Sequence, residues 1–309
     1  MNNKFKLIFF YKITIVFNLN KSNMNYSIAI HGGAGTILKS EMTNKQEEDY
    51  QDALNEALTA GYEILDKGGS SLDAVEIAVT YLENCPLFNA GKGSVFTNKG
   101  THEMDASIMN GVDQSAGAVA MLHAVKNPIN LARLVMEKTS HVLLAGQGAM
   151  DFANQMKVEM QNDDYFFNEY RYQQWLSVKE SPDMILDHTS SKNKKLGTVG
   201  AVALDQFGNM AAATSTGGMT NKKFGRIGDT PIIGSGTYAN NKTCAISCTG
   251  SGEYFIRCNA AFHVHSLMKY ANFNLTDACN EVVHKILMEL GGDGGLIGLD
   301  YQGNVCLSF

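Results

Sequence analysis

The chain contains few prolines and no closely spaced set of cysteines. Only 4 prolines and 6 cysteines occur among 309 residues, and no Cys-x-x-Cys pair is present. A disulfide framework normally belongs to a shorter, cysteine-dense secreted chain, so these thiols are expected to be reduced. Cys244 and Cys248 share one face of an expected strand, where apolar packing is a simpler role than metal binding. This composition favours a cytoplasmic protein.

Basic charge and long apolar runs are also scarce. The 31 acidic residues outnumber the 25 basic ones, giving a net charge of −6, whereas a nucleic-acid surface normally needs a basic stripe. The apolar run at residues 7–17 is interrupted by Lys12 and is shorter than the ~20 residues of a membrane span. Neither nucleic acid nor a membrane is therefore expected as a partner. Residues 1–23 are expected to form an extension outside the fold, with a signal peptide for export as the alternative.

Several widespread catalytic motifs are missing. The chain has no Gly-x-Ser-x-Gly nucleophile turn, no phosphate-binding Gly-x-x-x-x-Gly-Lys-[Ser/Thr] loop and no His-Glu-x-x-His zinc motif. The spacing Gly234-x-Gly236-x-x-Ala239 matches a dinucleotide pattern, but it leads into an expected strand instead of a helix. No cofactor is therefore expected to take part in catalysis.

Short apolar runs and amphipathic stretches make up the rest of the chain. Strands are expected at residues 26–31, 102–109, 117–125, 141–146, 198–204, 210–214 and 243–249, and as a pair at the C-terminus. Helices are expected at residues 50–65, 71–82, 131–137, 146–156, 169–180, 253–270 and 275–290. The polar segment 181–195 is expected to be an exposed loop. This order predicts an α+β fold in which helices cover layered sheets on both sides.

One threonine stands between this polar loop and a buried strand. Thr198 follows Gly197 and begins the expected strand. If the Gly197–Thr198 bond breaks, Thr198 gains an α-amine with an ordinary pKa near 8, and that amine can serve as general base for its own hydroxyl. Glycine at position 197 can adopt the strained backbone that an N-to-O acyl shift needs. On its own, a Gly-Thr pair before a strand is equally typical of a loop end.

Several long segments carry a family resemblance. They are IHGGAGT, LFNAGKGSVF, GTVGAVALDQFGNMAAATSTGGMTNKKFGRIGDTPIIGSGTYA, CTGSGEYFIR and GGLIGLDYQGNV. From about Tyr26 to Phe309 the chain resembles the plant-type L-asparaginase / isoaspartyl peptidase family of N-terminal-nucleophile hydrolases. The resemblance implies one domain over residues 24–309 with a four-layer αββα sandwich. It also implies self-cleavage between Gly197 and Thr198 into an α chain (residues 1–197) and a β chain (residues 198–309).

The resemblance assigns the catalytic residues. Thr198 is the implied nucleophile, and Thr216 is the implied hydroxyl that orients it. The Thr249 hydroxyl and the Gly250 N–H are implied to form the oxyanion hole, where one such donor commonly lowers the barrier by ~3 kcal/mol. Asn89 is implied to lie near the scissile bond. Taken singly, threonines in strands are common and carry no chemistry.

The resemblance also assigns the substrate-binding residues. Arg226 is the implied partner of the substrate α-carboxylate, because a guanidinium can bind a carboxylate through two parallel hydrogen bonds. Asp229 and the Gly252 carbonyl are implied to hold the substrate ammonium group, while Thr249 and Gly250 face the scissile carbonyl. The alternative for Arg226 and Asp229 is a surface ion pair worth under about 1 kcal/mol.

A glycine loop resembles the family's sodium-binding loop. Main-chain oxygens suit a hard cation, and side-chain identity matters little when carbonyls bind it. The alternative is a tight loop without an ion. The implied ligands for a structural Na⁺ are Leu82, Glu83, Cys85, Phe88, Ala90 and Lys92.

The implied activity is hydrolysis of L-asparagine and of isoaspartyl (β-aspartyl) dipeptides, by a homodimer of cleaved αβ units. A glycosylasparaginase is the nearest alternative, but that relative has Asp before its nucleophilic threonine, where Gly197 stands here. A truncated, non-catalytic homologue is the other alternative. The family continues past its last strand with an Asn-Thr-x-Gly-Met-like segment, whereas this sequence stops at Phe309.

Overall fold

Two β-sheets form the centre of the computed structural model, which describes residues 14–21, 24–33, 43–180 and 197–309. The first sheet has seven strands, in the spatial order β1 (Thr14–Lys21), β2 (Met24–His31), β6 (Val199–Leu204), β7 (Met210–Thr216), β3 (Met104–Asn110), β4 (Ala116–Leu122) and β5 (Leu143–Ala145). The second sheet has four strands, in the order β11 (Val305–Ser308), β10 (Gly294–Asp300), β9 (Cys244–Gly250) and β8 (Thr237–Ala239). All neighbours are antiparallel except β4 and β5.

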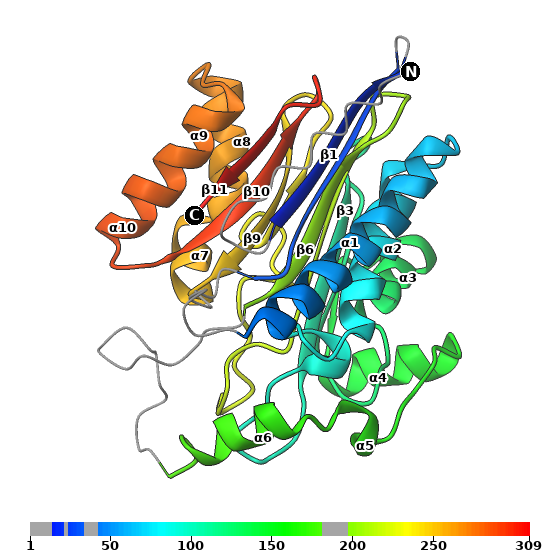
Figure 1. The fold of residues 1–309 in the computed structure, drawn as a ribbon, viewed down its shortest axis with the longest axis vertical. Coiled ribbons are helices and arrows are strands. Elements are labelled where there is room, and N and C mark those ends of the chain that lie inside the picture. Colours follow the sequence, from blue (N-terminus) through cyan, green and yellow to red (C-terminus); the bar gives the residue numbers. More distant parts are fainter. Residues whose placement is uncertain (1–13, 22–23, 34–42, 181–196) are drawn as a thin grey trace.

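Helices cover the outer faces of both sheets (Figure 1). Helices α1 (Asn44–Asp66), α2 (Ser71–Asn84) and α3 (Pro128–Lys138) lie on the seven-stranded sheet, with α4 (Gly146–Gln155), α5 (Asp163–Phe166) and α6 (Glu169–Leu176) toward one end. Helices α7 (Gly252–Cys258), α8 (Ala260–Tyr270), α9 (Leu275–Glu281) and α10 (Leu287–Glu289) lie on the four-stranded sheet, and a π-helical turn (Val282–Ile286) joins the last two. A short 3₁₀ turn (Gly91–Gly93) follows α2. The fold is therefore α+β.

Side-chain alternation explains why the sheets pack together. Strand β6 is buried throughout its length. Ala201 and Ala203 belong to the apolar cluster under α1–α3, whereas Val202 and Leu204 belong to the cluster between the sheets and under α7–α9. A strand buried on both faces reads as a continuous apolar run, which is how this segment was predicted. The segment after Thr198 is thus fixed between two apolar layers.

The structure differs from the sequence predictions at several points. Residues 14–21 pair with β2 as the edge strand of the large sheet, which corrects the prediction that residues 1–23 lie outside the fold. The helix expected over 253–270 divides at Asn259, whose φ of 48° is left-handed and ends α7. The three-residue strand β8 was not expected. The loop expected at 181–195 lies outside the described residues.

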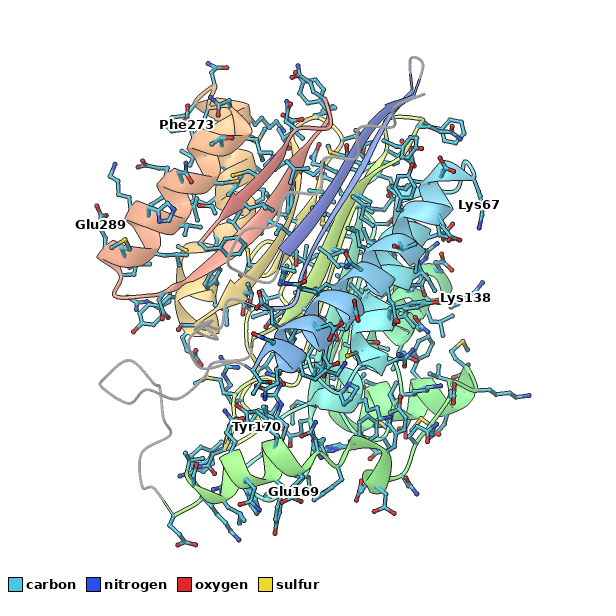
Figure 2. The ribbon with its side chains drawn as sticks, in the orientation of Figure 1. Lys67, Lys138, Glu169, Tyr170, Phe273 and Glu289 are labelled. Carbon is cyan, nitrogen blue, oxygen red and sulfur yellow. The ribbon has the colours of Figure 1, made fainter. Side chains whose placement is uncertain are left out.

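The remaining predictions about surface and thiols can also be compared with the structure. All six cysteines are free thiols, as predicted. In the described ranges, no helix is long and apolar enough to cross a membrane. Lys67, Lys138 and Glu289 point outward from the helical layers, away from the sheets (Figure 2).

Candidate active site

Two threonine hydroxyls meet at one end of the large sheet. Thr198 directly precedes β6 and is 8% exposed, and its Oγ1 donates a hydrogen bond of 3.2 Å to the Oγ1 of Thr216 at the end of β7. The main-chain N–H of Gly218 also donates to the Thr216 hydroxyl, at 3.0 Å. The Thr216 hydroxyl oxygen therefore accepts two hydrogen bonds, and its own proton points away from both donors. The structure brings this predicted pair together.

Asn89 supports the turn that follows Thr216. Its Nδ2 donates to the Gly218 carbonyl at 2.7 Å, and its main-chain oxygen accepts from Gly217 at 3.0 Å. Its Oδ1 accepts in turn from the N–H of Val95 at 3.1 Å. Asn89 thus lies next to the turn of Thr216 and ties it to the glycine loop after α2.

The Gly197–Thr198 junction packs against the glycine corner that follows β2. A Cβ placed on Gly33 would lie 2.7 Å from the nitrogen and 2.9 Å from the carbonyl oxygen of Gly197. Gly33 also has a φ of +124°, which side chains rarely adopt. Any other residue at position 33 would therefore displace the peptide that precedes Thr198. The two glycine motifs noted in the sequence form one close contact.

A charged pair joins the loop between β7 and β8 to helix α7. Arg226 donates from Nε and Nη2 to the two carboxylate oxygens of Glu253, at 2.8 and 2.9 Å. The Gly252 backbone lies against the same groups, because a Cβ there would sit 3.0 Å from Arg226 Nη2 and 2.8 Å from Asp229 Oδ1. Arg226, Asp229 and Gly252 are therefore neighbours, as predicted. Sequence reasoning did not identify Glu253, which lies inside the quoted CTGSGEYFIR segment but had no role there.

Asp229 is a buried carboxyl with unused hydrogen-bonding capacity. Its side chain is 3% exposed, and within the described part of the chain its Oδ2 has no hydrogen-bond partner. Burial raises the pKa of the Asp229 carboxyl to about 7, and the Arg226 guanidinium offsets only part of that shift. A buried carboxylate beside an arginine provides a site for a cationic group.

Two further charged residues near Arg226 and Thr216, Asp105 and Lys222, were not identified from the sequence. Asp105 is paired with Thr216 across β3 and β7, and it is fully buried. Burial raises its pKa, while the Lys222 ammonium and then the Arg226 guanidinium lower it. Lys222 is 4% exposed and donates to the Glu103 carbonyl at 2.6 Å. Asp105 therefore links the threonine pair electrostatically to the arginine site.

Thr249 and Gly250 lie at the end of β9, on the opposite sheet. Thr249 is fully buried, and Gly250 has a φ of +150° next to the close approach of Gly294. Ser247, two residues earlier on β9, lies 2.8 Å from Thr214, which is two residues before Thr216 on β7. Strands β7 and β9 are therefore packed against each other beneath the site.

In the glycine loop implied to bind sodium, main-chain carbonyl oxygens lie close to Gly91 and Gly93. A Cβ on Gly91 would lie 2.4 Å from the Glu83 carbonyl oxygen, and one on Gly93 would lie 2.0 Å from that of Phe88. Only glycine fits at these two positions, so the main-chain oxygens of Glu83 and Phe88, the kind of ligand that a hard cation prefers, lie directly against the loop. In the described ranges, no cluster of three or more His, Cys, Asp or Glu side chains is placed to hold a metal ion.

Comparison with known proteins agrees with this geometry. A protein-family model described as asparaginase matches residues 24–309. The isoaspartyl peptidase of Salmonella typhimurium is 52% identical over 285 residues, covering 91% of this chain and 91% of the relative. The isoaspartyl peptidase of Escherichia coli is 50% identical over 285 residues (91% and 89%), and the bovine isoaspartyl peptidase/L-asparaginase is 43% identical over 284 residues (91% and 88%). The chain therefore belongs to the asparaginase family of hydrolases.

Proposed function

We propose that the protein is a self-processing threonine hydrolase that cleaves β-aspartyl dipeptides and L-asparagine. The hydrogen bond between Thr198 and Thr216, at a junction that packs on Gly33, is the observation that carries this proposal. The two bacterial relatives are named isoaspartyl peptidases, and the bovine relative is named an isoaspartyl peptidase/L-asparaginase. Within this proposal the fold is the αββα sandwich of N-terminal-nucleophile hydrolases, supported by two stacked sheets between helices.

Self-cleavage creates the catalytic group. The Thr198 hydroxyl oxygen attacks the Gly197 carbonyl carbon, the C–N bond breaks, and the chain is joined briefly through an ester. Water then hydrolyses this ester, leaving a carboxylate on Gly197 and a free α-amine on Thr198. The close approach of Gly33 supports this step, because the Gly197 peptide packs directly against the Gly33 backbone, and a fixed geometry favours attack.

The freed amine then acts as the general base for substrate hydrolysis. It takes the proton from the Thr198 hydroxyl as the oxygen attacks the substrate side-chain carbonyl. The Thr249 hydroxyl and the Gly250 N–H stabilise the negative charge that develops on the carbonyl oxygen. The leaving amine receives the proton, and water releases aspartate from Thr198 in the second half of the cycle.

Recognition of the substrate requires an exchange of partners at Arg226. Its two donors already hold the Glu253 carboxylate, so a substrate α-carboxylate must replace that carboxylate. Glu253 is 37% exposed and can turn toward water. The substrate ammonium group then occupies the space at Asp229 Oδ2, with the Gly252 carbonyl beside it.

We expect the enzyme to hydrolyse β-Asp-Leu and L-asparagine but not α-Asp-Leu. In an α-linked peptide the α-carboxylate is part of the bond, so Arg226 loses its partner, and an unpaired polar site discriminates by about 10⁴-fold or more. The measurement compares kcat/KM for the three substrates on cleaved protein. Comparable turnover of the two dipeptides would overturn this assignment of the head-group site.

The preference for an α-ammonium group should depend on pH. Because burial raises the pKa of Asp229 to about 7, its carboxyl is neutral below this pH and attracts a cation less. The matched probe is succinamic acid, which is L-asparagine without the α-amino group. The ratio of kcat/KM for L-asparagine over succinamic acid should rise with pH through about 7 and fall again only where the α-ammonium group of L-asparagine loses its own proton. The titration of the Thr198 amine affects both substrates equally and therefore cancels from this ratio. A ratio that stays constant from pH 5 to 9 would contradict the role of Asp229.

Three further features complete the proposal. The carbonyl-lined loop after α2 binds a structural Na⁺, which would hold the turn bearing Asn89 and takes no part in the chemistry. The working form is a homodimer of cleaved αβ units, and no cofactor is needed. Six free thiols support a cytoplasmic location.

A further inference from the structure

A row of buried hydroxyl groups joins the two sheets directly beneath the proposed site. Ser247 Oγ lies 2.8 Å from His31 Nε2 and 2.8 Å from Thr214 Oγ1. Thr237 Oγ1 lies 2.5 Å from Thr214 Oγ1 and 2.8 Å from Ser107 Oγ. His31, Ser107 and Thr214 belong to the large sheet, whereas Thr237 and Ser247 belong to the small one. All four hydrogen bonds therefore cross from one sheet to the other.

Two members of this row lie on the strands that carry the proposed catalytic threonines Thr216 and Thr249. Thr214 precedes Thr216 by two residues on β7, and Ser247 precedes Thr249 by two residues on β9. Residues two apart on a strand share a face, so the Thr214 and Ser247 hydroxyls each lie next to a proposed catalytic threonine along their own strand. The far end of the row reaches the head-group site, because Ser107 Oγ lies 2.6 Å from the Thr230 carbonyl, next to Asp229.

A glycine, Gly200, lies on the backbone beside the row. A Cβ on Gly200 would lie 2.0 Å from Ser247 Oγ and 2.6 Å from His31 Nε2, so only glycine at this position permits their hydrogen bond. Gly200 is paired with both His31 and Thr214 on its neighbouring strands. Burial lowers the pKa of His31 to about 3, so its ring is neutral and can share a single proton with Ser247.

The surroundings of the row explain why directional bonds matter here. All five side chains are fully buried, and the contact between the sheets is otherwise mainly apolar, including Ala29, Val202 and Ala212. Apolar contacts are not directional, so they tolerate sliding of one sheet over the other. Hydrogen bonds have preferred lengths and angles, and buried polar groups are costly to leave unpaired. The row therefore favours one register between the sheets.

We propose that Ser107, Thr214, Thr237 and Ser247, which we call the inter-sheet hydroxyl row, are positioning residues for the reaction. The nucleophile Thr198 is on the large sheet, and the oxyanion donors Thr249 and Gly250 are on the small one. The row fixes the distance between them by fixing the register of the sheets. A displacement near 1 Å can reduce turnover by about 10²-fold. This inference rests on the proposed function, since it assigns the row to that reaction.

The test compares two substitutions of Thr214 with opposite effects on packing and polarity. Thr214→Val keeps the volume but removes the hydroxyl, whereas Thr214→Ser keeps the hydroxyl but removes the methyl group. We expect Thr214→Val to lower kcat for L-asparagine and β-Asp-Leu by about 10-fold or more. KM should stay within about twofold, because the substitution leaves the hydrogen bond from Ser107 to the Thr230 carbonyl, beside Asp229, in place. Thr214→Ser should keep kcat within about twofold of the wild type.

The control is Ser27→Ala. Ser27 is 1% exposed on β2, the strand of His31, and its hydroxyl donates to the Gly303 carbonyl at 3.3 Å, far along the strand from the row's end. This variant should keep wild-type kcat. Equal losses for Thr214→Val and Thr214→Ser, or wild-type kcat for Thr214→Val, would overturn the positioning role.

Two further measurements separate the possible failures. If Thr214→Val does not fold, kcat and KM of Ser247→Ala are measured instead, with the same expected loss of kcat. Loss of the thermal transition in both variants would assign the row to stability instead of positioning. A wild-type protein that hydrolyses neither substrate would overturn the proposed function. An active wild type with an equally active Thr214→Val variant would overturn only the positioning role.

Discussion

Thr198→Ala is expected to remain a single chain and to hydrolyse neither L-asparagine nor β-Asp-Leu. The substitution removes the oxygen that attacks Gly197, so no ester forms and no α-amine is released. Both the nucleophile and its base are then missing, and loss of a nucleophile commonly lowers kcat by about 10⁴-fold or more. Intact mass should show one species of the full length, whereas the wild type should separate into chains of residues 1–197 and 198–309.

A matched variant, Thr198→Ser, distinguishes the effect of losing the hydroxyl from the effect of changing the shape of the side chain. Thr198→Ser keeps the oxygen and loses only a methyl group, so it should still cleave itself, although more slowly. N-terminal sequencing of the smaller chain should then begin at residue 198. Cleavage of Thr198→Ala at the same position, or a mature chain that begins elsewhere, would contradict the proposed maturation.

Secondary structure was predictable wherever burial imposes a clear period. The apolar run of β6 and the helical spacing of α2, with its cap at Ser70, both have strong local signals, and the structure shows both elements. The break at Asn259 has no such signal, because apolar residues continue on both sides of it. Strand β8 has only three residues, and its strand conformation depends on its antiparallel pairing with β9.

The site was less predictable from local pattern than the fold. Thr198 and Thr216 could be grouped only through the family resemblance, since nothing in their spacing shows that β6 and β7 are neighbours. The pairing of Arg226 with Glu253 joins residues on separate elements, and so does the position of Asp105 opposite Thr216. The inter-sheet hydroxyl row likewise joins residues that lie on separate strands. Its serines and threonines are typical strand residues until the packing of the two sheets is known.

Arg226→Ala is expected to separate maturation from catalysis. Self-cleavage uses a peptide already held in place beside Gly33 and needs no free α-carboxylate, so the variant should still mature. Hydrolysis of L-asparagine needs the two parallel hydrogen bonds that only the guanidinium supplies. Removing one partner of such a charge pair commonly weakens binding by about 2–5 kcal/mol, so kcat/KM should fall by about 30-fold to 5,000-fold. Mass and steady-state kinetics on one preparation measure both effects.

The structure also indicates why this variant should fold. Glu253 is 37% exposed, so water can solvate its carboxylate once Arg226 is gone. Arg226→Lys keeps the charge but loses the planar pair of donors, and it should have intermediate kcat/KM. Arg133→Ala is the control, because Arg133 forms its ion pairs with Asp73 and Glu76 on the outer helices and should leave turnover unchanged. If Arg226→Ala hydrolyses L-asparagine with wild-type kcat/KM, the carboxylate is held elsewhere. If the variant fails to mature, Arg226 acts on the Gly197–Thr198 junction instead.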